Sequence, residues 1–390
     1  MSDMIDPALV RGAAELERTD RGLRVHRLPV WVREQCPDPQ LLSMQTQPAG
    51  VRVVARTTAS AFELEVHTAR IAYLGASRPR GRLDILVDGD LFQREVLTGG
   101  DVTEVDLRVG TTTFAAGAPH TTSVADLPAG EKVVEIWLPH NESVEVVSLR
   151  ADAPLRPEAD TRPRWVHHGS SISQGSGALA PTETWAALAA RRVGLDLRNL
   201  GFGGSALVDQ FMARVIRDSP ADLISVKLGI NVVNGDMMRV RAFTSAVHGF
   251  LDTIRDGHPT TPIVLISPIF CDIHETTPGP GAFDMTTLGT DQVRFVATGD
   301  PADAARGKPT LRSIRAELAS LTERRGADPH LHYLDGTTLF GPADAVELPL
   351  PDALHPNALA HKRIGERFAT YLAENAVPLG LRAIHSSEVR

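Results

Sequence analysis

Residues 164–175 of the chain read RWVHHGSSISQG. The stretch begins as a buried-type strand and runs directly into a turn built from glycine and serine. A serine that follows such a strand, flanked by Gly169 and Gly175, can lie on a sharp strand-to-helix turn with its hydroxyl exposed and its backbone amide facing the same space. The stretch therefore predicts one strand of a parallel sheet, with a reactive serine at its carboxyl end.

The alternation of an apolar strand with an amphipathic helix continues to the end of the chain. Each of five strands has a helix after it, which predicts a parallel sheet covered on both faces, a three-layer α/β/α domain of flavodoxin-like appearance. Ligands of such sheets bind at the carboxyl ends of the strands. The five strand segments are RWVHHG, DLRNLGF, ADLISVKLG, PIVLISPIF and LHYLDG.

The region from about residue 25 to 150 has a different pattern. Short segments with alternating or clustered apolar residues, such as VRVVART, AFELEVHT and KVVEIWLP, are separated by turn residues. This spacing predicts an all-β sandwich of jelly-roll type, with tight hairpin turns at DGD (88–90) and at the AsnGlu pair of PHNES (139–143).

A segment rich in proline and charge, ADAPLRPEADTRPR (151–164), separates the two patterns and is typical of a linker. We therefore expect two domains, a β-sandwich over 1–155 and an α/β domain over 156–390. Residues 272–309 contain many Gly, Pro and Thr residues and one short strand, QVRFVA. A loop of this length within a compact domain is usually functional or disordered.

Four segments with polar or glycine residues stand where the strands end or just before the last helix: GSSISQG (169–175), NLGFGG (199–204), LGIN (228–231) and DALHP (352–356). Serine needs a base to become a nucleophile at neutral pH, and an imidazole supplies it. Asp352 and His355 are three residues apart, close enough for the carboxylate to hold one ring nitrogen and leave the other for the serine. The Gly204 amide and the Asn231 side chain, with the Ser171 amide, are candidate donors to an oxyanion.

These four segments, in this order, resemble the signature blocks of the SGNH (GDSL-type) hydrolases over roughly 165–375. The resemblance implies that Ser171 is the nucleophile, His355 the general base and Asp352 the residue that orients it. It also implies that Gly204 and Asn231 donate to the oxyanion. A β-sandwich ahead of this domain resembles the order in family 2 carbohydrate esterases, which deacetylate sugars.

Two positions depart from the family pattern. The first block of the family usually reads Gly-Asp-Ser, whereas Ser170 replaces the acid here and leaves two adjacent serines as candidates; the register of the block favours Ser171. The third block usually ends in Asp, and Val232 takes its place. No serine is flanked as Gly-x-Ser-x-Gly, which argues against an α/β-hydrolase.

Charge and composition restrict the remaining classes. The formal net charge of −8 and the lack of a basic stripe argue against a nucleic-acid partner. The acidic start lacks a secretory signal and no stretch is apolar enough to span a membrane, so we expect a cytoplasmic protein. Cys36 and Cys271 are expected to be reduced structural thiols.

We expect neither a cofactor nor a metal, because no phosphate-binding glycine loop or ligand cluster is visible. His167 and His168 are interpreted as a packed or substrate-facing pair. His274 and Glu275, which open the long loop, are interpreted as solvated residues, with a position lining the substrate pocket as the alternative.

The sequence thus predicts a serine esterase acting on a small-molecule ester, with a short acyl group such as acetyl and a carbohydrate or small metabolite as the alcohol. Two alternatives stay open. An acyltransferase would use the same acyl-enzyme, and a carbohydrate-binding protein would carry a catalytically silent hydrolase domain.

Overall fold

The computed structural model describes residues 5–76, 78–290 and 292–381. The chain divides into two compact units, one up to Thr161 and one from Arg162 onward. The short segment Ala180–Thr182 and residues 289 and 290 also belong to the first unit by their contacts.

The second unit is built on a five-stranded sheet in which every neighbouring pair is parallel. The strand order is β15-β14-β16-β17-β20, which is 2-1-3-4-5 in chain order within this unit and is the flavodoxin-like order. The parallel sheet predicted from the sequence is confirmed. Its strands are β14 (Arg164–Gly169), β15 (Asp196–Gly201), β16 (Leu223–Lys227), β17 (Ile263–Ile266) and β20 (Leu331–Leu334).

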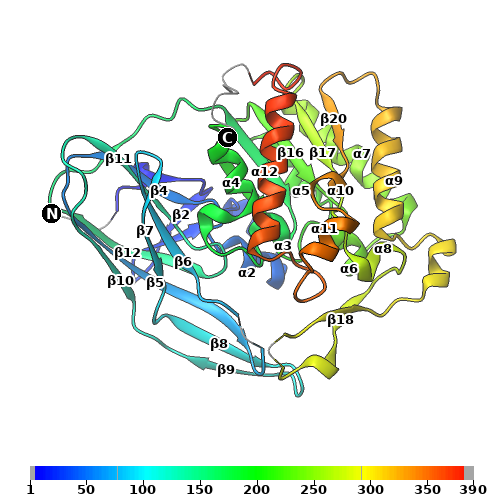
Figure 1. The fold of residues 1–390 in the computed structure, drawn as a ribbon, viewed down its shortest axis with the longest axis horizontal. Coiled ribbons are helices and arrows are strands. Elements are labelled where there is room, and N and C mark those ends of the chain that lie inside the picture. Colours follow the sequence, from blue (N-terminus) through cyan, green and yellow to red (C-terminus); the bar gives the residue numbers. More distant parts are fainter. Residues whose placement is uncertain (1–4, 77, 291, 382–390) are drawn as a thin grey trace. The chain divides into compact units, whose positions relative to one another are not determined.

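Helices cover both faces of this sheet, as the three-layer prediction requires (Figure 1). On one face, Trp165 of β14 stacks on Phe368 of α12 with ring centroids 5.3 Å apart. On the other face, His168 stacks on Phe250 of α7 at 6.0 Å. The helices of the unit are α3 (Ser171–Gln174), α4 (Trp185–Arg192), α5 (Gln210–Arg217), α6 (Ile230–Asn234), α7 (Val240–Gly257), α8 (Asp272–Glu275), α9 (Leu311–Arg324), α10 (Gly336–Leu339), α11 (Pro342–Glu347) and α12 (Ala358–Glu374).

The first unit consists of two sheets that enclose one apolar core, to which alternate residues of the strands contribute, Val25, Leu64, Ile85 and Ile136 among them. One sheet contains β1 (Val10–Arg11), β4 (Arg52–Thr57), β6 (Arg82–Val87), β7 (Asp90–Val96), β11 (Lys132–Trp137) and β13 (Arg156–Pro157). The other contains β2 (Glu15–Arg18), β3 (Leu23–His26), β5 (Phe62–Tyr73), β8 (Asp101–Asp106), β9 (Thr111–Ala115), β10 (His120–Val124) and β12 (Ser143–Ala151). Two short helices, α1 (Val30–Gln35) and α2 (Pro39–Gln45), complete the unit.

One of the two predicted hairpins is present. Asp88 and Gly89 both have positive φ, 49° and 90°, and join β6 to the antiparallel β7 in the manner of a type I′ turn. The second prediction is wrong, because β11 and β12, on either side of PHNES, belong to different sheets. The turn residues of PHNES mark a crossing between sheets, which local sequence does not distinguish from a hairpin. The pair β5 and β8 is also parallel, in a unit whose other strand pairs are antiparallel.

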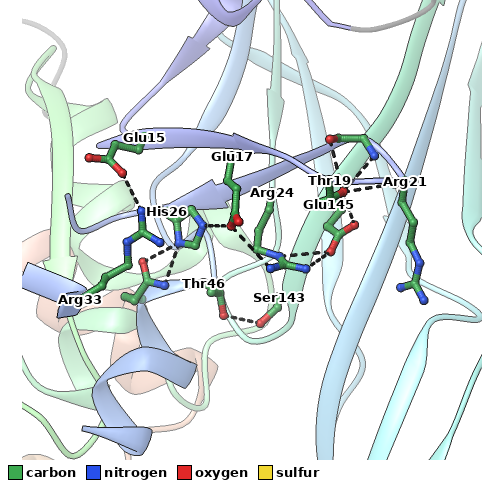
Figure 2. Close-up of polar contacts among 12 residues, drawn as sticks. Glu15, Glu17, Thr19, Arg21, Arg24, His26, Arg33, Thr46, Ser143 and Glu145 are labelled. Atoms are coloured by element: carbon green, nitrogen blue, oxygen red, sulfur yellow. Dashed lines mark hydrogen bonds and ion pairs between the residues drawn. The ribbon is translucent and has the colours of Figure 1, made fainter. Parts of the chain in front are cut away.

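Charged side chains link the strands of the second sheet of this unit (Figure 2). The Arg24 guanidinium donates to Glu145 of β12 from Nε at 3.1 Å and lies 3.5 Å from Glu17. The buried ring of His26 bonds with Glu17 through Nε2 at 2.8 Å and with the Gln45 side chain through Nδ1. The hydrogen bond from His26, helped by nearby arginines, lowers the pKa of Glu17 against the opposing effect of burial.

The segment 272–309, predicted to be a long loop, contains regular elements among its described residues, 272–290 and 292–309. It contains α8, a two-stranded hairpin of β18 (Gly281–Phe283) and β19 (Phe295–Ala297), and two 3-10 turns, Met285–Thr287 and Pro301–Arg306. The predicted strand within QVRFVA is β19. None of the helices in the described part of the chain is both long and apolar enough to cross a membrane.

A buried ion pair gives a stability prediction for the first unit. Asp84 of β6 is fully buried and accepts hydrogen bonds from Arg94 Nε at 2.6 Å and from the Thr182 hydroxyl at 2.6 Å. Asp84→Ala leaves both donors without that acceptor, so we expect the free energy of unfolding of this unit to fall by about 3–5 kcal/mol, measured by urea denaturation. Glu63→Ala, which breaks the exposed 3.5 Å pair with Arg150, is the control and should shift the midpoint little. Equal shifts for the two variants would contradict this interpretation.

Candidate active site

The two adjacent serines after β14 have different environments. Ser170 is completely buried and is the N-cap of α3, where its hydroxyl accepts the Ile172 amide at 3.4 Å. Ser171 is the first residue of α3 and is partly exposed. Its Oγ lies 2.9 Å from Nε2 of His355. The geometry thus separates a capping serine, Ser170, from Ser171, which faces an imidazole.

His355 lies between Ser171 and a carboxylate. Its Nδ1 is 2.7 Å from Oδ2 of Asp352. Because the carboxylate accepts the Nδ1 proton, the neutral ring presents the lone pair of Nε2 to the Ser171 hydroxyl. The side chains of His355 and Asp352 are only 18% and 28% exposed. The three side chains Ser171, His355 and Asp352 are thus largely shielded from bulk water but still reachable by a small molecule.

The loop before α12 holds Asp352 in place. Its Oδ1 accepts the backbone amides of Leu354 at 2.9 Å and of His355 at 2.6 Å, and Ala353 between them adopts a positive φ of 65°. Burial raises the pKa of Asp352, but the hydrogen bonds from the His355 ring and from these amides outweigh it, and the pKa lies below its usual value. The carboxylate therefore remains charged at neutral pH.

The hairpin of the long loop borders this series. The Phe295 amide donates to the carbonyl oxygen of Asp352 at 2.8 Å. The Phe295 ring meets the His355 ring edge-on, with ring centroids 5.8 Å apart. The Phe295 ring also packs against the Phe283 ring, with centroids 4.7 Å apart. The loop thus supplies an aromatic wall beside the imidazole.

Gly204 lies in a loop whose backbone amides are otherwise occupied. From Gly201 to Ala206 each amide has an acceptor, except that of Gly204, which donates no hydrogen bond within the described residues. Gly204 is also exposed and has a φ of 72°, a conformation that glycine adopts at little cost. Its amide is therefore available to an oxygen of a bound molecule.

Asn231 is connected to the same loop. Its Oδ1 accepts the amide of Ala206 at 3.1 Å, which orients the side chain so that Nδ2 remains as the donor end. Within the part of the chain that the structure describes, neither this Nδ2 nor the Ser171 amide has an acceptor. All three donor groups named from the sequence are thus without an acceptor in the described fold, which is what an oxyanion site requires.

The other histidines of the sequence analysis have structural roles. His167 is fully buried, with one ring nitrogen 2.7 Å from Ser225 Oγ and the other 2.8 Å from Ser173 Oγ, and burial lowers its pKa well below the usual value. His168 is buried on the opposite face, where burial lowers its pKa to about 4. Both pack in the core.

The interpretation of His274 and Glu275 as solvated residues is wrong. His274 is fully buried and bonds to Asn234 Oδ1 at 3.1 Å, while Glu275 forms an ion pair with Arg315. Both face elements that are far away in the sequence, so the local composition gave no sign of their burial.

Sequence reasoning also missed His361, which lies in α12, six residues after His355. Its Nδ1 accepts the amide of Trp185 at 3.3 Å and its Nε2 donates to the carbonyl of Ser176 at 2.9 Å. Burial lowers its pKa to about 4, so the ring is neutral. His361 thus connects α12, the helix that follows His355, to the segment that follows Ser171. The only sign of His361 in the sequence is its position six residues after His355. Its partners, Trp185 and Ser176, could not be identified without the fold.

Comparison with known proteins agrees with this geometry. The model of the GDSL-like lipase/acylhydrolase family matches residues 168–363, a range that contains all four segments GSSISQG, NLGFGG, LGIN and DALHP. The chain belongs to this family, and its resemblance to the SGNH hydrolases is confirmed. A search of curated protein sequences found no match.

Several solved structures are similar over nearly the whole chain. The salicylyl-acyltransferase SsfX3 from a tetracycline biosynthetic pathway is 30% identical, with 97% of each chain covered and a TM-score of 0.77. A putative GDSL-like lipase from Bacteroides ovatus is 19% identical, covers 97% of this chain and 96% of its own, and has a TM-score of 0.66. A family two carbohydrate esterase from Clostridium thermocellum, at 12% identity, covers 84% and 93% with a TM-score of 0.55, a likeness of fold.

The contrast between the two serines gives a direct test. Ser171→Ala should abolish covalent labelling by a fluorophosphonate, because the hydroxyl facing His355 is gone, with little change in the thermal midpoint. Ser170→Ala should keep the labelling but lower stability by about 0.5–2 kcal/mol, the usual cost of a lost N-cap. Mass spectrometry of the labelled peptide distinguishes the two, and an adduct on Ser170 would overturn the assignment.

Proposed function

We propose that the protein is a serine acylhydrolase that forms an acyl-enzyme on Ser171. The observation that carries the proposal is the hydrogen-bonded series from Ser171 Oγ through the His355 ring to Asp352, at 2.9 and 2.7 Å. The location supports it as well. Ser171 follows β14 and Asn231 follows β16, the two strands between which the order of the sheet reverses, and this switch point is where open α/β sheets bind ligands.

In the proposed reaction, His355 Nε2 takes the hydroxyl proton as Ser171 Oγ attacks the ester carbonyl carbon. The carbonyl oxygen becomes an oxyanion that accepts hydrogen bonds from the Ser171 and Gly204 amides and from Asn231 Nδ2. When the tetrahedral intermediate collapses, the bond to the alcohol oxygen breaks and His355 gives that oxygen its proton. Water then attacks the acyl-enzyme, His355 again takes and returns the proton, and the acid leaves with Ser171 restored.

For the substrate we propose an ester of a small molecule, with acetyl on a carbohydrate or metabolite as the first candidate. The choice is suggested by the fold that the chain shares with a family two carbohydrate esterase.

A second candidate is transfer of the acyl group to an alcohol instead of water. It is favoured by the salicylyl-acyltransferase, which is similar in sequence along 97% of this chain. The Phe295 ring beside His355 offers an apolar edge against which an aromatic acyl group can pack. The acyl-enzyme on Ser171 is common to both candidates, so they differ only in what attacks it.

The carboxylate of Asp352 provides a kinetic test. Asp352→Asn cannot accept the Nδ1 proton and favours the wrong ring tautomer, so we expect kcat for an aryl ester to fall by roughly four orders of magnitude, as in other serine triads. Glu347→Gln, at an exposed pair with Arg363, is a control that should retain full turnover. A loss of less than about tenfold in Asp352→Asn would remove Asp352 from the mechanism.

The two candidate functions are distinguished by the fate of the acyl group. Purified protein is incubated with acetyl and salicylyl aryl esters, with and without a sugar or polyol acceptor, and the free acid and the new ester are quantified. A hydrolase releases acid stoichiometrically with the phenol in both conditions, whereas a transferase diverts most of the acyl group to the acceptor. If neither ester is turned over and Ser171 remains unlabelled, the proposal of a silent binding domain replaces both.

A further inference from the structure

Gln174, the last residue of α3, has a side chain that bonds to the loop carrying Gly204. It is buried, 4% exposed, and its Oε1 accepts the backbone amide of Gly203 at 2.8 Å. α3 packs tightly on the end of β15 at this point, since a Cβ on Gly201 would lie 2.4 Å from the amide nitrogen of Gln174. Gln174 thus lies between the helix that begins at Ser171 and the amide next to that of Gly204.

The hydrogen bond from Gly203 to Gln174 restrains the backbone at a point where two glycines, Gly203 and Gly204, are adjacent. Glycine has the widest choice of backbone conformations, so two in succession can rotate the amide between them in many directions. On either side the loop is held elsewhere: the Phe202 amide donates to the Gly169 carbonyl at 2.8 Å, and the Ala206 amide donates to Asn231. Between these points, the Gly203 amide is bonded to a side chain and that side chain is Gln174.

The bond between Gln174 and Gly203 also determines which of the two glycine amides has no acceptor. The turn around both glycines is closed by the Ser205 amide, which donates to the Phe202 carbonyl at 3.1 Å, but that bond involves neither the Gly203 nor the Gly204 amide. If the Gly203 amide had no acceptor of its own, these two neighbouring donors would compete for an oxyanion. With Gly203 occupied by Gln174, the Gly204 amide is left as the single free donor of the segment within the described residues. A donor is effective in catalysis when its direction is set before charge develops.

We propose that Gln174 is a positioning residue of the oxyanion site: its side-chain oxygen holds Gly203 so that the Gly204 amide points toward the reacting carbonyl oxygen. The inference rests on the proposed function, because it presumes an acyl-transfer reaction at Ser171. Gln174 itself does not touch the substrate. Its effect on the rate passes through the backbone of Gly203 and Gly204.

The test compares Gln174→Met, which keeps the volume but lacks the acceptor, with the wild-type protein. We expect Gln174→Met to reduce kcat for an aryl ester by about 10- to 100-fold with KM nearly unchanged, less than the roughly 100- to 1,000-fold that follows complete removal of a donor. The decisive readout is the ratio of ester to thionoester turnover. Sulfur accepts hydrogen bonds weakly, so a misdirected donor slows the ester more than the thionoester, and the ratio falls.

Two further variants separate positioning from general stability. Gln174→Glu retains an acceptor oxygen, so the ratio should stay near the wild-type value even if the added charge slows both substrates. Ser225→Ala removes the hydroxyl that bonds to Trp165 and His167 in the same core, and should lower stability without changing the ratio. An unchanged ratio in Gln174→Met, at reduced or full rate, would overturn the proposal.

A measurement without substrate covers the case in which the proposed function fails. Amide hydrogen exchange should show Gly203 protected in the wild-type protein and in Gln174→Glu, and exchanging faster in Gln174→Met. If wild-type protein hydrolyses esters through Ser171 but exchange at Gly203 is the same in all three, only the role of Gln174 is refuted. If exchange follows the expectation while no ester is hydrolysed, the bond exists but the role in catalysis is refuted together with the proposed function.

Discussion

The site depends on the position of β14 between two parallel neighbours. Its register pairs Gly169 with Gly201 of β15 and His168 with Val226 of β16, so the three strands end at one edge. The segments after these strands carry Ser171, Gly204 and Asn231, and parallel pairing makes them neighbours although they come from different parts of the chain. A shift of one residue in either pairing would reverse the faces of the strand and separate Gly204 and Asn231 from Ser171.

Much of this could be predicted from the sequence because it depends on local periodicity and on short motifs at strand ends. Ser171, Asp352 and His355 stand in such motifs, and the structure brings their side chains into one hydrogen-bonded series. Gln174 and His361 could not be predicted, since their importance depends on partners supplied by other segments. In the sandwich, β9 could not be predicted as a strand. Every residue of TTTFA is exposed, so its sequence does not alternate between apolar and polar residues.

The histidines of the second unit differ in burial and in their contacts. His167, His168 and His361 are completely buried, and loss of solvation lowers the pKa of each, so they remain neutral and act as fixed donors and acceptors. His355 is partly exposed, and its ring lies between the Ser171 hydroxyl and the Asp352 carboxylate, at 2.9 and 2.7 Å. Burial therefore distinguishes these three imidazoles from that of His355, which contacts Ser171 and Asp352.

The contact between Ser171 and His355 joins residues 184 positions apart in the chain. In a folding intermediate that has the first strands of the second unit, but in which α12 has not yet docked, Ser171 lacks its contact with His355. Such a species would have native-like secondary structure and no reactivity toward fluorophosphonates. The recovery of labelling during refolding therefore reports when α12 and the loop before it reach Ser171, an event that circular dichroism alone would not resolve.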